Sequence, residues 1–231
     1  MTVVSQPDVS VNILAANTLV ANTDQKVLFI GQKVAAGSAV SGALNTGIAN
    51  DNSWDALFGI NSMLAKMIRD ARKLNSDVRF DAIALDDAAG AAAEGTITIV
   101  GVPTEDGTID VIVGSKYNHN YTIPLATGDA IADIATAIAA AITADTKCPC
   151  SALAALGVVT ITADNLGAVG NTIGIKVEGT VEGSVITVVG MTGGATDPTL
   201  TTVFDVIGDQ RYQTIVWPYD QDLTTVKTFL D

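Results

Sequence analysis

Few side chains in this sequence have the types and the spacing that chemistry requires. The two cysteines, Cys148 and Cys150, flank Pro149 and would offer thiolates to a metal. A structural zinc site takes four ligands in a tetrahedron, and these two thiols lack the second pair of ligands. We therefore expect two reduced cysteines in a turn and no metal site.

The only histidine of the sequence, His119, lies in the polar stretch Tyr117-Asn118-His119-Asn120-Tyr121. A hydrolase would need a nucleophile and an orienting acid beside this base, and the sequence has neither a nucleophile elbow nor a second identifiable catalytic group. A lone histidine in such a stretch is far more often a solvated surface residue than a general base. We therefore expect that the protein is not an enzyme and holds no cofactor; a hydrolase is the least favoured hypothesis.

Two other groups of residues resemble ion or phosphate sites, and both lack the full pattern. Asp86 and Asp87, with Glu94 nearby, have neither the regularly alternating ligands nor the glycine of a calcium loop. The pair Gly193-Gly194 does not belong to a phosphate-binding loop with a lysine. We expect a solvated junction at the first group, and a turn with a helix cap at the second.

One cluster has the residue types that bind a sugar. Tyr117 and Tyr121 offer rings for stacking, and Asn118 offers an amide for hydrogen bonding. Aromatic residues make up only 5% of the sequence, which counts against carbohydrate binding. We keep a carbohydrate-binding β module as the alternative function.

The composition favours a folded, anionic protein. The chain of 231 residues is long enough for one large or two small domains, and its 48% apolar residues can fill real cores. A net charge of −13 at pH 7 opposes binding to phosphates, so we expect no direct contact with nucleic acid. No segment approaches the run of about 20 apolar residues that a spanning helix needs, so membrane insertion is not expected. Residues 1–24 lack a basic region followed by an apolar core, so we expect no secretory signal.

The elements that would position these residues belong to a β-rich block, residues 87–195. Glycine-bounded runs with alternating apolar residues predict strands at 95–101 and 107–114, which we expect to pair as a meander. A helix that opens at Thr127 or Asp129 is expected to carry its isoleucines on one stripe. These are Ile131, Ile134, Ile138 and Ile142. Further strands are expected at 117–124, 158–163, 172–178 and 184–189, which gives about six strands and one helix.

The segments on either side of this block predict pieces of a second unit. Before it we expect a buried strand at 26–31, a loop at 37–52, a helix from an N-cap at Ser53 to about Asn75, and a strand at 78–85. After it we expect a helix at about 200–209, a strand at 212–217 and the start of a helix at 223–230.

The predicted fold class is therefore α+β or α/β, a partial α/β core interrupted by an inserted β-rich domain. We expect an extended N-terminal arm at 1–24, the first part of the core at 25–86, the insertion at 87–195, and a return to the core, expected to be incomplete, at 196–231. In the arm, Val9, Val11 and Ile13 alternate, which predicts an extended segment with one apolar edge.

Several short fragments follow the arm in a fixed order. They are Val27-Leu28-Phe29-Ile30-Gly31, a helix segment at 59–67, the stretch 86–98 beginning Asp86-Asp87-Ala88-Ala89-Gly90, the turn Gly167-Ala168-Val169-Gly170-Asn171, the exit Gly193-Gly194-Ala195-Thr196-Asp197-Pro198, and Ile215-Val216-Trp217-Pro218-Tyr219. In this order they resemble the N-terminal half of Mu-like contractile phage tail sheath proteins. The resemblance spans nearly all of the chain.

That resemblance implies a structural protein of the virion tail, assembled in the cytoplasm of the host bacterium. Such subunits form stacked rings around a tail tube and contract to drive the tube through the bacterial envelope. The implied partners are further copies of the chain, the tail tube protein, the baseplate and the tail terminator. The alternative remains an outward carbohydrate-binding β module of a virion or surface assembly.

The resemblance also gives the arm a role. In such sheaths, extended chain ends add strands to neighbouring subunits, and the inserted domain lies outward on the particle. We therefore expect Val9, Val11 and Ile13 to form the apolar edge of an inter-subunit strand, and Asn17, Asn22 and Asp24 to belong to its hinge. Relatives carry a C-terminal half that this sequence lacks.

Overall fold

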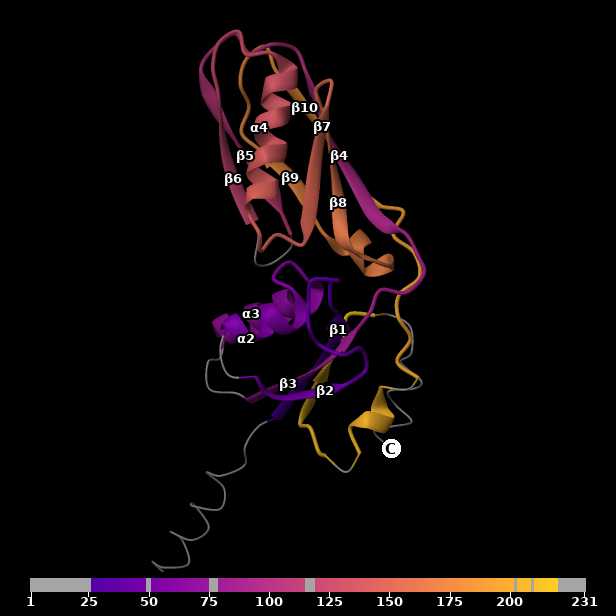
Figure 1. The fold of residues 1–231 in the computed structure, drawn as a ribbon. Coiled ribbons are helices and arrows are strands. Elements are labelled where there is room, and N and C mark those ends of the chain that lie inside the picture. The colour runs from indigo at the N-terminus through magenta and orange to yellow at the C-terminus, as the bar shows by residue number, and fades with distance from the viewer. Residues whose placement is uncertain are drawn as a thin grey trace, which may run out of the picture.

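The computed structural model describes residues 26–48, 51–74, 79–114, 119–201, 203–208 and 210–219. The described part of the chain is a mixed α+β structure with several sheets and few helices, divided into two lobes (Figure 1). We call residues 26–85 with 200–219 the core lobe, and residues 92–192 the β-rich lobe. The predicted arm strand, its hinge and the predicted helix at 223–230 lie outside the described residues.

The core lobe is built on a sheet whose described strands lie in the order β11-β1-β3-β2. Strands β1 (Lys26–Gln32) and β3 (Arg79–Leu85) are parallel neighbours, and β11 (Thr214–Val216) runs parallel to the other side of β1. From Phe80 to Leu85 every side chain of β3 is buried, as is usual where both faces of a sheet are covered. The predicted strands at 26–31 and 78–85 are thus confirmed.

The expected loop at 37–52 is wrong in part, because β2 (Leu44–Ile48) pairs antiparallel with β3. Its sequence has little β propensity, and a register shift separates Asn45 from Ile48. Gly47, at a φ of 67°, donates its N–H to the buried carboxylate of Asp81. Tertiary pairing therefore specifies this strand more than its own composition does.

The single helix expected from Ser53 to Asn75 is also wrong, because two helices occupy this stretch. Helix α2 (Asp51–Phe58) contains Ser53, and α3 (Met63–Leu74) begins after a break at Gly59. Gly59 has a φ of 85°, and a Cβ there would lie 2.2 Å from a methyl of Val34. Ser62 then caps α3 by accepting a hydrogen bond from the N–H of Ala65.

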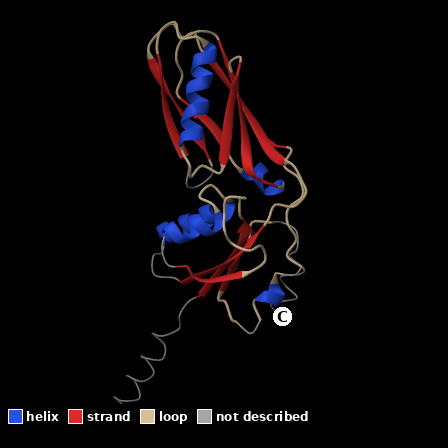
Figure 2. Cartoon of the chain, in the orientation of Figure 1, coloured by secondary structure: helices blue, strands red, loops and turns tan. Residues whose placement is uncertain are grey.

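The two faces of the core sheet carry different covers (Figure 2). On one face, Phe29 and Phe80 pack with Trp54, Phe58 and Leu64 of the helices. On the other face, Leu28, Ile30 and Ile83 pack against the segment 200–219. The buried residues of that segment are Leu200, Val203, Phe204, Ile207 and Tyr219.

The helix predicted at about 200–209 is wrong. The described residues there form one short 3₁₀ turn, η2 (Phe204–Val206), within an otherwise irregular segment. The predicted strand at 212–217 is present as the shorter β11. An irregular path lets apolar side chains of 200–219 fill the sheet face without the regular spacing of a helix.

The β-rich lobe has two antiparallel sheets in its described part. One has the order β10-β4-β8-β7 and the other β6-β5-β9. Their bounds are β4 (Ala92–Val100), β5 (Gly107–Val113), β6 (His119–Leu125), β7 (Cys150–Ala155), β8 (Val158–Leu166), β9 (Ile175–Glu178) and β10 (Val185–Thr192). The expected pairing of β4 with β5 as a meander is wrong, because these strands lie in different sheets. Strand β7 was not predicted.

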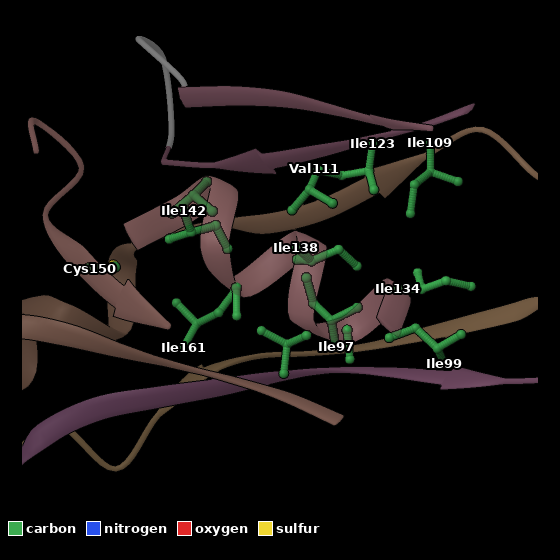
Figure 3. Close-up of a cluster of buried hydrophobic side chains, with 14 of the residues drawn as sticks. Ile97, Ile99, Ile109, Val111, Ile123, Ile134, Ile138, Ile142, Cys150 and Ile161 are labelled. Carbon is green, nitrogen blue, oxygen red and sulfur yellow. The ribbon is translucent and has the colours of Figure 1, made fainter. Parts of the chain in front are cut away.

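Isoleucines dominate the core between these sheets (Figure 3). Helix α4 (Ile131–Ala144) buries Ile134, Ile138 and Ile142, which confirms the predicted stripe. The predicted caps at Thr127 and Asp129 are wrong, because Ala130 is the N-cap residue and makes no side-chain cap bond. The Asp129 carboxylate accepts from the N–H of Ala126 instead, closing the turn before the helix.

No helix in the described ranges is both long and apolar enough to cross a membrane.

Candidate functional site

The β-rich lobe is joined to the core lobe by two connecting segments that pair with each other. Ala91 and Ala195 form an antiparallel bridge, with N–H to carbonyl distances of 3.2 Å in both directions. The Ala91 carbonyl also accepts from the N–H of Gly167 at 3.0 Å. At Gly90 a Cβ would lie 2.0 Å from the Ala195 carbonyl oxygen, so only glycine permits this close approach. We call residues 86–91 with 193–199 the stem.

Asp87 is the main polar contact between the stem and both lobes. Its carboxylate accepts from Nε2 of Gln32 at 2.7 Å, from Nδ2 of Asn165 at 3.0 Å and from the N–H of Leu166 at 3.2 Å. Gln32 is fully buried and also donates to the Leu166 carbonyl at 2.6 Å. The end of β1 is thereby tied to the end of β8.

The end of β8 is also tied to the start of α3. The Oδ1 atom of Asn165 accepts from the N–H of Met63 at 2.9 Å, and its Nδ2 donates to the Lys33 carbonyl at 3.0 Å. Asp164 accepts from Nδ2 of Asn61 at 2.7 Å. Burial is the largest influence on Asp164 and raises the pKa of its carboxyl, although the bond from Asn61 opposes this rise. We call Asp164, Asn165 and Leu166 the β8 latch.

An apolar cavity of about 240 Å³ lies beside this latch, between the lobes. Met63 and Met67 line it from the core lobe, and Val169 and Ile173 line it from the β-rich lobe. Methionine side chains adapt readily to changes of shape. The junction therefore combines directional hydrogen bonds with a region that has room for small adjustments.

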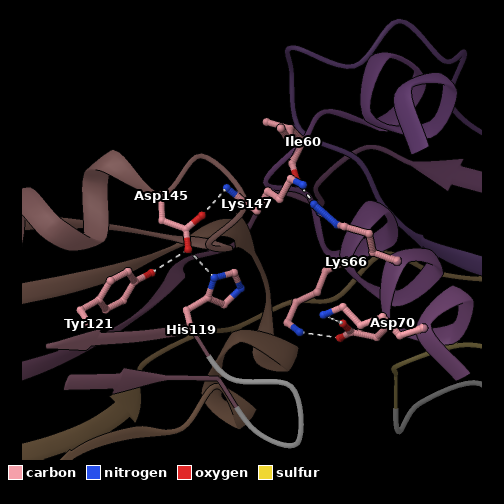
Figure 4. A network of polar contacts seen from close by, with 9 residues as sticks. Ile60, Lys66, Asp70, His119, Tyr121, Asp145 and Lys147 are labelled. Atoms are coloured by element: carbon pink, nitrogen blue, oxygen red, sulfur yellow. Dashed lines mark hydrogen bonds and ion pairs between the residues drawn. The ribbon is translucent and has the colours of Figure 1, made fainter. Parts of the chain in front are cut away.

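A second group of polar residues faces α3 across the junction (Figure 4). Nδ1 of His119 lies 2.6 Å from Oδ2 of Asp145, and the Tyr121 hydroxyl donates to the same oxygen at 3.2 Å. Burial opposes ionisation of Asp145, but the bonds from His119 and from the N–H of Lys147 outweigh it and hold the pKa of this carboxyl below its usual range. Burial likewise raises the pKa of Tyr121.

The helix side of this group is basic. Lys66 pairs with Asp70 at 2.5 Å, Lys73 pairs with the same carboxylate at 3.3 Å, and Arg69 donates to the Ile60 carbonyl at 2.6 Å. Together with His119, Asp145 and Lys147 these side chains line a cavity of about 210 Å³. These bonds lie within the core lobe, and those of Asp145 lie within the β-rich lobe, so the two groups face each other across the cavity.

Several sequence-based interpretations need correction at this junction. His119 is not a solvated residue, because its side chain is only 16% exposed and contacts Asp145. Asp87 is not part of a simply solvated junction, since it accepts three hydrogen bonds there. Asp86 is the solvated member; it pairs with Lys33 at 2.8 Å, and that bond lowers the pKa of its carboxyl.

The proposed sugar-binding cluster is not assembled in the described residues. Tyr121 donates to Asp145, while Tyr117 and Asn118 lie outside the described ranges. Cys148 and Cys150 are free and buried, with Cys150 at the start of β7. In the ranges that the structure describes, no group of three or more histidine, cysteine or acidic side chains is placed to hold a metal ion.

The predicted inter-subunit strand and hinge lie in residues 1–25, outside the described part, so the structure brings none of those residues together. The β8 latch was missed by sequence reasoning. Its signal is the pair Asp164-Asn165, where two polar residues interrupt the apolar alternation at the end of a strand. Such an interruption indicates a strand end that contacts a polar partner.

Comparison with known proteins gives a substantial similarity in sequence. The chain is 30% identical over 200 residues to the Mu-like prophage FluMu tail sheath protein of Haemophilus influenzae, a match that covers 84% of this chain and 40% of the relative. The chain thus spans about two fifths of the length of that relative. No family model matches the sequence.

A solved structure, a sheath tail protein from Listeria innocua, aligns with 97% of this chain and 48% of its own at 14% identity. Its TM-score of 0.33 is too low to define a common overall fold. The sequence similarity to the prophage protein confirms the resemblance predicted from the ordered fragments. The chain is a relative of the Mu-like phage tail sheath proteins.

Proposed function

We propose that this chain forms part of a structural, non-enzymatic subunit of a contractile tail sheath. The subunit polymerises around a tail tube and contracts to drive the tube through the bacterial envelope. The observation that carries the proposal is the 30% identity over 200 residues to a tail sheath protein. The junction is compatible with this role, because it ties two lobes together and offers no catalytic group in its described residues.

The proposed domain organisation follows the same similarity. An N-terminal arm occupies 1–24, a sheath core occupies 25–86 and 196–231, and an inserted outward domain occupies 87–195. The stem supports this division, since the chain leaves the core lobe and returns to it through two paired segments. The β-rich lobe also has a hydrophobic core of its own, whose residues all lie between 93 and 191.

The partners in this proposal are further copies in stacked rings, the tail tube protein, the baseplate and the tail terminator. The assembled protein belongs to the virion tail and is built in the cytoplasm of the host bacterium. No contact with nucleic acid is proposed, in line with the charge of −13.

Strand addition is the proposed means of polymerisation. Val9, Val11 and Ile13 form the apolar edge of a strand lent to a neighbouring copy, and Asn17, Asn22 and Asp24 belong to the hinge at its base. The strands β11 and β2 support this idea, because they are the edges of the core sheet in the described residues and expose backbone groups. A strand on a flexible base keeps copies connected while the bodies rotate.

The test is polymerisation of the sheath in the particle that contains this chain. Negative-stain electron microscopy of the wild type should show a striped sheath that thickens and shortens on contraction. The variant V9D/V11D/I13D places charges along the apolar edge and should abolish striped sheath. Particles without any sheath in the wild type would contradict the proposed function.

The matched control is S10D/N12D, which adds charges at the alternate positions of the same segment. Because alternate side chains point to opposite faces of a strand, this control should leave the sheath intact. Intact sheath in V9D/V11D/I13D would contradict the proposed strand while leaving the sheath function standing.

A further inference from the structure

The outer face of the sheet β10-β4-β8-β7 is almost free of charge. Burial alternates along each strand, and the register places outward side chains beside one another in rows. One row contains Val189, Thr96, Thr160 and Leu153. The other outward residues are Glu94, Thr98, Val100, Ser151, Ala155, Val158, Thr162, Val185 and Thr187. Glu94 is charged, and Asp164 adds a second carboxylate at the end of the face next to the core lobe, where it accepts from Nδ2 of Asn61. We call this outer face of the sheet the threonine face.

The second sheet of the same lobe is the natural comparison. Its outward positions include Asp110 of β5 and the pair Lys176 and Glu178 of β9. Lys176 and Glu178 form an ion pair, and Asp110 accepts from the hydroxyl of Thr122. A charged outer face is usual for a solvated sheet in a chain that carries −13. The lack of charge is thus specific to the threonine face.

Exposed aliphatic side chains gather on this face. Leu153, Val185, Val100 and Val189 are 74%, 63%, 57% and 54% exposed. They come from three of the four strands and lie among threonines, so they form a mixed aliphatic and hydroxyl surface. Contiguous surfaces of this kind mark protein contacts more often than scattered exposed residues do.

The hairpin tip at one end of the face gives an independent signal. Leu156 and Gly157 form the two-residue loop between β7 and β8, with φ values of 50° and 83°. Such loops favour Asn or Asp before the glycine, because other residues are strained at positive φ. Here the position holds a leucine that is 93% exposed. A strained, fully exposed apolar side chain is poorly explained by the stability of its own hairpin.

We propose that the threonine face and the Leu156 tip form a contact with a second copy of this chain. The choice of partner rests on charge and on the proposed sheath function, in which copies stand close together. Residues 87–195 carry three lysines against eleven aspartates and glutamates, so two such lobes repel each other through most of their surface. The threonine face has Glu94 and, at the end that Asn61 contacts, Asp164, so it is where two lobes can approach with the least repulsion.

The size of the face predicts a weak contact. Four strands spaced by about 4.8 Å, with rows over about 20 Å, present roughly 400 Å² on each copy. The total of about 800 Å² is below the roughly 1,200 Å² at which stable specific interfaces begin, so isolated chains associate only at high concentration. In an array, where each copy is held beside its neighbours, the same contact is strengthened by the high effective concentration.

The test measures self-association of the 231-residue chain carrying V9D/V11D/I13D, which removes the proposed arm contact, by sedimentation equilibrium up to millimolar concentration. Leu156→Asn removes the apolar tip while placing a residue that favours positive φ, so the hairpin keeps its fold. This variant should raise the dissociation constant about tenfold or more. Thr160→Glu puts a charge at the centre of the face and should abolish association. Thermal unfolding of each variant shows that the fold is retained.

Two controls match these changes away from the face. Val40→Asn alters another exposed aliphatic residue, 72% exposed, in the core lobe, and Asn120→Glu adds a charge on the outer face of the second sheet. Both should leave the dissociation constant within about twofold of the chain that carries only the three arm substitutions. Equal loss in the controls would overturn the proposal, as would a chain that stays monomeric at every concentration or an association insensitive to Leu156→Asn and Thr160→Glu.

The sheath function is tested separately by electron microscopy of particles. Wild-type particles that form and contract a sheath, together with a chain that does not self-associate through this face, would overturn the contact and leave the proposed function standing. Wild-type particles that form no sheath would contradict the proposed function itself.

Discussion

The two lobes bury the apolar faces of their sheets in different ways. In the core lobe the parallel strands β1 and β3 are buried on both faces, so covers are needed from α2 and α3 on one side and from 200–219 on the other. The β-rich lobe pairs its strands antiparallel and closes its core within residues 93–191. The core lobe therefore depends on segments separated by the whole β-rich lobe, while the β-rich lobe depends only on itself.

The two lobes differ in net charge as well as in topology. Residues 25–86 contain seven lysines and arginines against six acidic residues, whereas residues 87–195 contain three lysines against eleven acidic residues. Helix α3 contributes four of the basic residues, and its Lys66, Arg69 and Lys73 line the junction opposite His119 and Asp145. The near-neutral lobe thus presents a basic helix to the acidic one.

The largest effects are expected from truncations in the two cores. Ile138→Ala in α4 and Leu64→Ala in α3 each remove a fully buried side chain and should cost about 2–5 kcal/mol. If the lobes are separate cooperative units, differential scanning calorimetry should show a different transition shifted by each variant. Hydrogen exchange would assign each transition to its lobe. If either variant lowered the protection from hydrogen exchange in both lobes, the two lobes would be one cooperative unit. That result would contradict the division into two independent cores.

An intermediate effect is expected at the stem. Asp87→Ala leaves the donors of Gln32, Asn165 and Leu166 without their acceptor and should cost about 1–3 kcal/mol. Hydrogen exchange should rise at the β8 latch before it rises in either core. Asp86→Ala is the control, because it removes an exposed carboxylate of one surface ion pair and should cost less than about 1 kcal/mol. Equal costs at the two positions would refute the assignment of Asp87 as the main junction contact.

The smallest expected effect is the dependence of the free energy of unfolding on pH through Asp145. The pKa of Asp145 in the folded protein lies below its ordinary value of 3.8, so its contribution to stability is present above that value and is lost as the pH falls through the folded pKa. Asp145→Asn should therefore cost up to about 1 kcal/mol in urea unfolding near neutral pH and progressively less below pH 3.8. The same substitution at the exposed Asp205 should change the free energy of unfolding by less than about 0.5 kcal/mol at either pH. If the destabilisation by Asp145→Asn increased as the pH fell, the contact with His119 would not be stabilising the ionised form of Asp145.

Sequence patterns predicted the elements whose periodicity is strong. The alternating strands β4, β5, β8 and β10 and the isoleucine stripe of α4 follow directly from spacing. Pairing was harder, since adjacent strands such as β4 and β5 look like a hairpin and lie in separate sheets. Packing in the core between the sheets decides which sheet each strand joins. The spacing of residues within one strand carries no information about that packing.

The weak elements were missed for physical reasons that differ from one to the next. Strand β2 depends on an open edge of β3, and the break at Gly59 depends on a backbone conformation and on contact with Val34. The contact of His119 with Asp145 joins a strand to the end of a helix 26 residues later. Each of these features needs a partner distant in sequence, so local composition gives little warning of it.

The bridge between Ala91 and Ala195 has a consequence for engineering. Because the two crossings already lie side by side, a short turn could replace everything between them without stretching the core lobe, and a foreign domain whose ends are adjacent could be grafted at the same place. In the proposed sheath, which has one such position on every copy, the stem would serve as a display site repeated along the length of the tail.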